Sequence, residues 1–135
     1  MLEISSTALQ RVIALTHADP AREVCGLLFG TDARIDRAEP CANVAAEPAR
    51  TFEIDPGTLF AALRAERAGR ARVIGYWHSH PSGDTRPSVT DAAMAAPDGK
   101  LWLIVAGDAI GLWRAAGATQ NCRFTAISYC VAADV

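Results

Sequence analysis

The segment His78–Asp91 constrains this chain more than any other, because it places two histidines directly after the apolar run Val73–Trp77. The β-branched and aromatic residues of that run predict a buried strand. Side chains alternate between the two faces of a strand, so His78 and His80 point to the same side. Two imidazoles on one face supply half of the ligands that a zinc ion needs.

A carboxylate follows at a position where a helix should begin. The residue types at 81–84 favour a tight turn, and an Ala-rich segment begins at Ala92. Ser88 is predicted to be the N-cap of a short helix, with Asp91 in its first turn. A strand end with two histidines and a helix start with an aspartate can converge on one metal ion. Three protein ligands would leave the fourth position open, as catalytic zinc requires.

Hydrolysis at such an ion also needs a general base and a donor to the developing oxyanion. Glu23 begins the apolar segment 23–30, where burial raises the pKa of a carboxyl group, and is the candidate base. From spacing alone, a solvated glutamate at a helix-to-strand junction explains Glu23 equally well. Ser88 is the candidate donor to the oxyanion. Ser88 and Asp91 can also form a capping box without any metal, and the two roles are compatible.

Composition narrows the class of protein. The 135 residues indicate one domain over 1–135, and half of them are hydrophobic. The net charge of −2 and the absence of a basic patch exclude nucleic acid as an expected partner. The arginines between 64 and 72 are interpreted as the solvated face and end of a helix. The chain has neither an apolar run of about 20 residues nor a signal-peptide pattern, so we expect no membrane segment and a cytoplasmic location.

The four cysteines lack Cys-x-x-Cys spacing, so we expect reduced thiols. Cys25 and Cys130 are predicted to lie in the core.

Apolar periodicity and turn residues give the remaining elements. Helices are predicted at 6–18, 56–68 and 92–96, and strands at 23–30, 34–36, 41–44, 51–54, 72–77, 101–105, 110–114 and 122–131. The second helix is expected to bury Leu59, Phe60 and Leu63. Helices interleaved with strands predict an α/β fold built on a single mixed sheet flanked by helices.

These residues resemble a known family. His78-x-His80-Pro81, followed after seven residues by Ser88-x-x-Asp91, is similar to the JAMM motif of MPN-domain (JAB1/MPN/Mov34) zinc metallopeptidases. The segment 21–30 resembles that family's first element, which carries the catalytic glutamate. The resemblance extends over nearly the whole chain and fits the prokaryotic stand-alone branch. It implies a curved, mostly antiparallel sheet flanked by helices.

The resemblance also implies the roles of the residues. His78, His80 and Asp91 would bind one Zn²⁺ per chain, Glu23 would act as acid and base, and Ser88 would help to stabilise the oxyanion. The implied substrate is a peptide or isopeptide bond, cleaved after the C-terminal Gly-Gly of a ubiquitin-like or sulfur-carrier β-grasp protein. A small adduct on such a protein is a further candidate, and family members often form homodimers.

The short link between the motif and the next strand distinguishes this chain from ubiquitin-chain-selective relatives. Only residues 92–100 separate Asp91 from Leu101, which leaves no room for the insertions that grip ubiquitin chains. This favours a minimal domain that holds an extended tail, and segment 52–54 is a candidate for pairing with that tail by β-augmentation.

Three other functions fit the sequence less well. Residues 80–84 with Pro87-Ser88 also resemble the RadC family associated with DNA repair, but the net charge and the Glu23-x-Cys25-Gly26 element argue against it. A non-enzymatic MPN scaffold would not need the metal ligands that this chain retains. A deaminase-type zinc site would need a Pro-Cys-x-x-Cys pair, which is missing.

Overall fold

A computed structural model describes residues 1–117 and 122–134 and contains one eight-stranded sheet with three helices. The strand order is β7-β6-β5-β4-β2-β3-β1-β8. The elements in chain order are β1 (Leu2–Ser5), α1 (Ser6–Ala18), β2 (Cys25–Gly30), β3 (Arg34–Cys41), α2 (Pro56–Arg67), β4 (Val73–Ser79), α3 (Val89–Met94), β5 (Leu101–Ala106), β6 (Ala109–Gly117), β7 (Cys122–Ala126) and β8 (Tyr129–Ala132). The predicted mixed α/β fold is confirmed.

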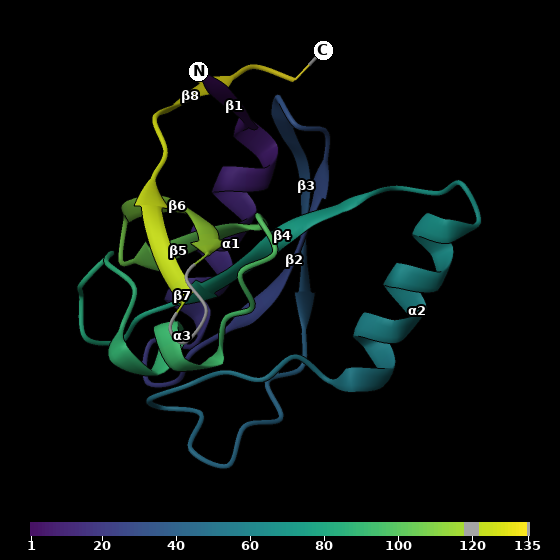
Figure 1. Ribbon diagram of the computed structural model, residues 1–135. Helices are drawn as coiled ribbons and strands as arrows, with labels where there is room; N and C mark the ends of the chain where they lie inside the picture. Colours follow the sequence, from purple (N-terminus) through teal and green to yellow (C-terminus); the bar gives the residue numbers. More distant parts are fainter. Residues whose placement is uncertain (118–121, 135) are drawn as a thin grey trace.

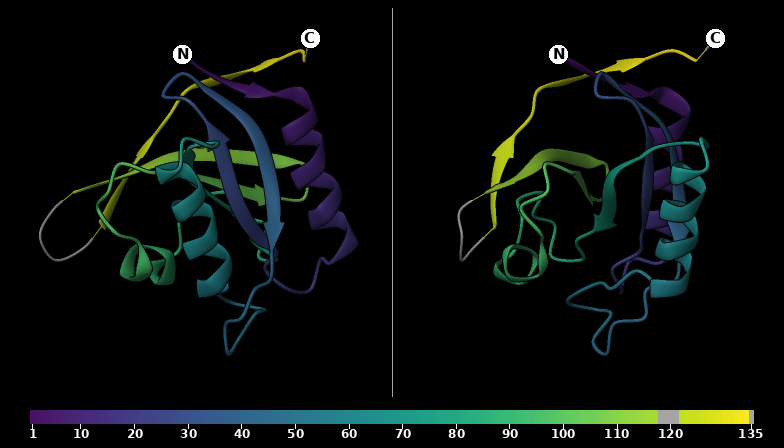
Figure 2. Two further views of the ribbon diagram at one scale, coloured as in Figure 1. Left: turned by 90° about the vertical axis from the view of Figure 1, so that its right-hand side faces the viewer. Right: turned by 45° about the vertical axis from the view of Figure 1, so that its right-hand side comes forward.

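The sheet is curled, and its pairing is mixed (Figures 1 and 2). Strand β1 pairs in parallel with β3 and β8, and β4 pairs in parallel with β5. The four other pairs are antiparallel. The curl explains how β7 and β8, which follow each other in the chain, occupy opposite ends of the strand order. The backbone N–H of Ile127 still donates to the carbonyl of Leu112 in β6, whereas the carbonyl of the next residue, Ser128, already accepts from the N–H of Leu2 in β1.

Two hydrophobic clusters cover the two faces of the sheet. One contains α1, which packs its buried residues Ala8 and Val12 against Leu28, Trp77 and the odd-numbered residues of β5. The other contains Cys25, Leu27, Val73, Trp102 and Ala115, together with Phe52 and Ile54. Because side chains alternate along a strand, His78 faces this second cluster. The metal-ligand candidates therefore lie on the face opposite α1.

Side-chain caps mark the starts of the first two helices. The side chain of Ser5 accepts a hydrogen bond from Ala8 N at the start of α1, and Asp55 accepts from Thr58 N at the start of α2. Helix α2 projects from the sheet (Figure 1), and none of its residues is fully buried. Phe60 is 63% exposed, so the prediction that it is buried is wrong. Leu59 and Leu63, also predicted to be buried, are only partly so.

Several strand predictions need correction. The segment 122–131 is two strands rather than one, because the chain crosses between the two ends of the curled sheet. Segment 51–54 forms no strand; its one ladder contact is an isolated bridge between Ile54 and Asn43. Cys25 is buried as predicted, but Cys130 is exposed on β8. Segment 34–36 extends into the longer strand β3, which ends at Cys41.

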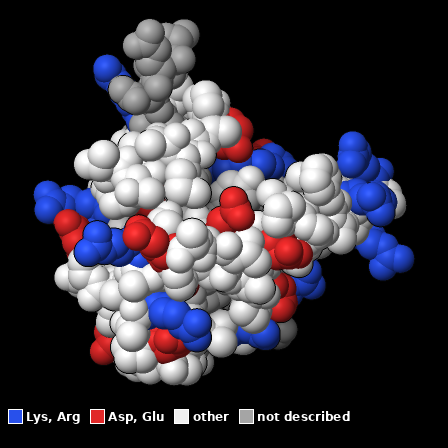
Figure 3. Space-filling model, turned by 90° about the horizontal axis from the view of Figure 1, so that it is seen from below, with Lys and Arg blue, Asp and Glu red and all other residues white. Residues whose placement is uncertain are grey.

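The surface agrees with the interpretation of the arginines. Arg64, Arg67, Arg70 and Arg72 are all exposed, and basic residues cluster at the outer end of the projecting helix seen from below (Figure 3). Within the described residues, no helix has the length and apolar character needed to cross a membrane.

The contrast between the core and α2 can be measured. Leu28 is fully buried, so Leu28→Ala should reduce the free energy of unfolding by about 3 kcal/mol. Phe60→Ala removes a larger side chain but should cost less than about 0.5 kcal/mol, because that ring is mostly in solvent. Urea denaturation of both variants tests this. Equal losses would mean that α2 packs more tightly than its exposure indicates.

Candidate metal centre

The two histidines lie at the end of β4, where the sheet fixes their backbone on both sides. His78 is fully buried and pairs in register with Cys25 on β2 and Ile104 on β5. His80 lies just beyond the strand, and its backbone N–H donates to the carbonyl of Val105. This continued pairing keeps the alternation intact, so both imidazoles face the same side, as predicted.

Three candidate ligand atoms converge at this strand end. His78 Nε2 lies 3.0 Å from His80 Nε2 and 3.1 Å from Asp91 Oδ2, and His80 Nε2 lies 3.0 Å from that same oxygen. A zinc ion bound about 2.0–2.1 Å from such atoms holds them roughly 3.3 Å apart in a tetrahedron. The triangle is only slightly tighter than this, and two imidazoles with one carboxylate are zinc ligands by chemistry. The residues therefore fit the ion.

Helix α3 delivers the carboxylate through its N-terminal cap. Ser88 Oγ accepts a hydrogen bond from Asp91 N at 3.0 Å, and Ser88 N donates to Asp91 Oδ2 at 2.9 Å. The predicted capping box is thus present, and it orients the same oxygen that faces the histidines. The hydroxyl of Ser88 accepts in this contact, so its hydrogen is still available to a ligand.

The two imidazoles are held in different ways. His80 Nδ1 lies 2.6 Å from the carbonyl oxygen of Asp84, which makes Nδ1 the protonated nitrogen and leaves Nε2 to bind a metal. His78 instead stacks on Phe52, with ring centroids 4.3 Å apart, and meets the edge of Trp102. Its Nδ1 has no hydrogen-bond partner within the described residues. On that side of the ring, aromatic packing takes the place of the hydrogen bond that His80 Nδ1 makes.

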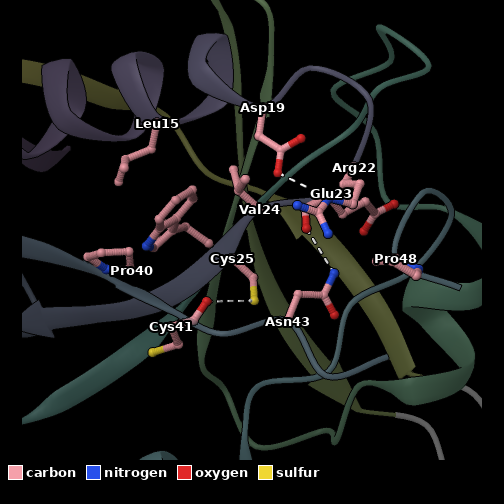
Figure 4. Close-up of a pocket in the computed structure, with 11 residues that line it drawn as sticks. Leu15, Asp19, Arg22, Glu23, Val24, Cys25, Pro40, Cys41, Asn43 and Pro48 are labelled. Carbon is pink, nitrogen blue, oxygen red and sulfur yellow. Dashed lines mark hydrogen bonds and ion pairs between the residues drawn. The ribbon is translucent and has the colours of Figure 1, made fainter. Parts of the chain in front are cut away.

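Glu23 lies beside the triangle, before the start of β2. Its backbone N–H donates to Pro48, and its carbonyl accepts from Asn43 Nδ2 at 2.8 Å. Glu23 and Asn43 are among the residues that line a pocket of about 230 Å³, and Figure 4 shows how these residues lie. Glu23 is 5% exposed, and its Oε1 has no partner among the described residues. One ligand atom from each of Glu23, His78, His80 and Asp91 lies within 4.8 Å of the others.

The two carboxyl groups of the cluster have pKa values shifted in opposite directions. Burial raises the pKa of Glu23 to about 7, with His80 opposing and Asp91 adding to the rise. Burial alone would raise the pKa of Asp91 as well, but hydrogen bonds from His78 and His80 hold it well below its usual range. Asp91 is therefore the charged member of the pair, while Glu23 can exchange a proton near neutral pH.

Two depressions lie near the triangle. One, of about 270 Å³, is bordered by Glu23, His80 and Ser88 together with Arg50. The other, of about 230 Å³, is an apolar groove between segment 52–54 and the end of α3, with Trp102 at its base. Phe52 and Trp102 line this groove and also contact His78, so these two rings separate the groove from the buried imidazole.

Sequence reasoning missed three contributors. Asp84 was interpreted as a turn residue only, yet its carbonyl orients His80. Asn43 bonds to the backbone at Glu23, Thr51 and Glu53 and so joins the catalytic candidate to the groove. Phe52 was assigned to a strand, and nothing in the sequence indicated that it stacks on His78.

Comparison with known proteins gives one family. Residues 5–123 match the family of prokaryotic homologs of the JAB domain. The desampylase of Haloferax volcanii is 40% identical over 113 residues, which cover 78% of this chain and 81% of that protein.

Solved structures share the fold. The solution structure of a protein from Desulfitobacterium hafniense matches with a TM-score of 0.82 at 20% sequence identity. The match covers 100% of this chain and 95% of that protein's chain. A structure that describes JAMM as a metalloprotease-like zinc site in the proteasome and signalosome has a TM-score of 0.61 at 18% identity, with 98% of each chain covered.

The raised pKa of Glu23 makes a prediction for the metal-free protein. A group whose pKa is raised by folding stabilises the fold below its unfolded pKa and loses that contribution as pH rises toward the folded value. The parent protein should therefore lose stability between pH 5 and pH 8 relative to Glu23→Gln, by roughly 2 kcal/mol. Urea denaturation with a chelator present measures the difference. A pH-independent difference would show that the Glu23 carboxyl is not desolvated.

Proposed function

The chain belongs to the prokaryotic homologs of the JAB domain, and we propose that it is a zinc-dependent hydrolase of isopeptide or peptide bonds in ubiquitin-like β-grasp proteins. The observation that carries the proposal is the triangle of His78, His80 and Asp91 with the unpartnered carboxylate oxygen of Glu23 beside it. Similarity to a desampylase supports the class of substrate. Residues 1–135 act as one domain in this proposal.

Each residue has a defined task. His78, His80 and Asp91 hold one zinc ion, which when bound supplies a water of lowered pKa and polarises the scissile carbonyl. Glu23 accepts the proton of the attacking water and returns it to the leaving amine, which its pKa near 7 permits in both directions. Ser88 donates its free hydroxyl hydrogen to the developing oxyanion.

The apolar groove suits an extended C-terminal tail. The N–H of Glu53 donates to Asn43 Oδ1, and its carbonyl accepts from Val44 N. Both backbone groups of Glu53 therefore bond on the side away from the groove. Because backbone groups alternate along an extended segment, Phe52 and Ile54 turn theirs toward the groove. A tail of small residues that ends in Gly-Gly can lie between this segment and Ala95–Ala96 and reach the metal.

The same groove supports a finer proposal about the substrate. A ubiquitin-like or sulfur-carrier protein would place its tail in the groove and its leaving group in the depression beside Glu23 and Arg50. Short residues at the tail's end are required because Phe52 and Trp102 narrow the approach to His78.

Metal content and activity should separate by variant. The parent should bind about one zinc per chain, and a chelator should abolish cleavage of a β-grasp protein fused through its C-terminal glycines. Glu23→Gln should retain the zinc and lose roughly 10²–10⁴-fold in kcat, because the proton acceptor is gone. Asp91→Asn should lose the zinc itself. Metal analysis and a gel-based cleavage assay measure both, and normal cleavage by Glu23→Gln would refute the assigned base.

The groove is tested on α3, which carries two exposed apolar residues on different sides. Met94 lines the groove, whereas Val89 is 89% exposed outside it. Met94→Trp should fill the groove and raise KM about tenfold with zinc content unchanged, and Val89→Trp should leave KM within about twofold. Equal KM values for the two variants would place the tail elsewhere.

A further inference from the structure

The loop 81–88 between β4 and α3 contacts one of the candidate metal ligands. The carbonyl of Asp84 accepts from His80 Nδ1 at 2.6 Å and so fixes the tautomer and the orientation of that ring. The loop is poorly suited to this task by itself, because residues 81–84 are exposed. Among the described residues, the Asp84 side chain bonds only to Arg86, inside the same loop. Something outside the loop has to fix the position of the Asp84 carbonyl.

Strand β6 supplies that support. The indole Nε1 of Trp113 donates to the carbonyl of Thr85, the residue next to Asp84, at 2.9 Å. The neighbouring Gly111 makes the close approach possible, since a Cβ at that position would lie 2.4 Å from the same carbonyl oxygen. Trp113 is itself held in the sheet, paired in register with Trp102 on β5 and Ala126 on β7. The loop is thus tied to a rigid strand at the residue beside the one that orients His80.

We propose that Trp113 is a positioning residue for the metal centre, which acts through the Thr85 carbonyl to hold the Asp84 carbonyl against His80 Nδ1. The zinc ligand that β4 supplies is then oriented by a strand two positions away in the sheet. Loss of a group that hydrogen-bonds a metal-bound histidine typically lowers metal affinity about 10–100-fold. The Trp113–Thr85 hydrogen bond lies one contact further from the metal, so its loss should have a smaller but measurable effect. This inference rests on the proposed zinc function.

The test compares two tryptophans that each donate an indole hydrogen bond to a backbone carbonyl. Trp113→Phe removes the bond to Thr85, and the control Trp77→Phe removes the bond of Trp77 to the Glu39 carbonyl, on the other side of β2. Trp113→Phe should weaken zinc binding about threefold to tenfold in a chelator competition, because the loop is released. The zinc affinity of Trp77→Phe should stay within about twofold of the parent's, even if Trp77→Phe lowers the melting temperature more than Trp113→Phe does.

A second readout reports on the hydrogen bond itself. In zinc-loaded protein, the Nδ1 proton of His80 should exchange with water faster in Trp113→Phe than in the parent or in Trp77→Phe, as followed by NMR. Gly111→Ala should have the same two effects by displacing the Thr85 carbonyl, and it serves if Trp113→Phe fails to fold.

Parent-like zinc affinity and proton exchange in Trp113→Phe or Gly111→Ala would overturn the positioning role. An equal loss of affinity in Trp77→Phe would also overturn it, because general destabilisation would then explain the effect. If the parent itself binds no zinc, the proposed function fails together with this inference, an outcome distinct from the other two.

Discussion

The burial of one carboxylate oxygen against two imidazole nitrogens is the constraint around which this molecule is organised. Asp91 Oδ2 lies within 3.1 Å of both His78 Nε2 and His80 Nε2, and all three residues are buried. A buried charge is costly unless it is paired, so the sheet, the α3 cap and the surrounding rings must hold the group in register. The same arrangement offers a metal ion three candidate ligands and leaves Glu23 beside them with an oxygen that has no partner among the described residues.

One side of the site is built from a strand of the sheet, and the other side from irregular segments. Strand β4 fixes both histidine backbones between β2 and β5 and supplies their common direction. The opposite side of the site is built from irregular segments, namely the chain before β2, residues 42–55 and the loop before α3. Each of these is fixed by a few polar contacts, with Asn43 binding the first two and Trp113 the third. Binding residues commonly lie in loops. Here hydrogen bonds from the side chains of Asn43 and Trp113 fix the positions of those loops.

Local patterns predicted the parts of the site that depend on neighbours in sequence. The spacing of His78 and His80 requires only strand alternation, and the pairing of Ser88 with Asp91 requires only the first turn of a helix. Both were therefore predictable. The role of Glu23 was left open by spacing, because its desolvation depends on residues 43–48 closing over it, and it was favoured only by the family resemblance. Phe60 was mispredicted as buried because helical periodicity cannot show that a helix stands away from its sheet.

The sequence by itself determined the ligand types, their common face, the helix cap and the family, because each is encoded within short stretches of chain. Tertiary structure alone decided that Phe52 stacks on His78, that Asp84 orients His80 and that β7 and β8 lie at opposite ends of the strand order. These contacts join segments distant in sequence or depend on backbone carbonyls that every residue possesses. No local pattern of residue types can specify them, because they arise from the curl of the sheet and the path of its loops.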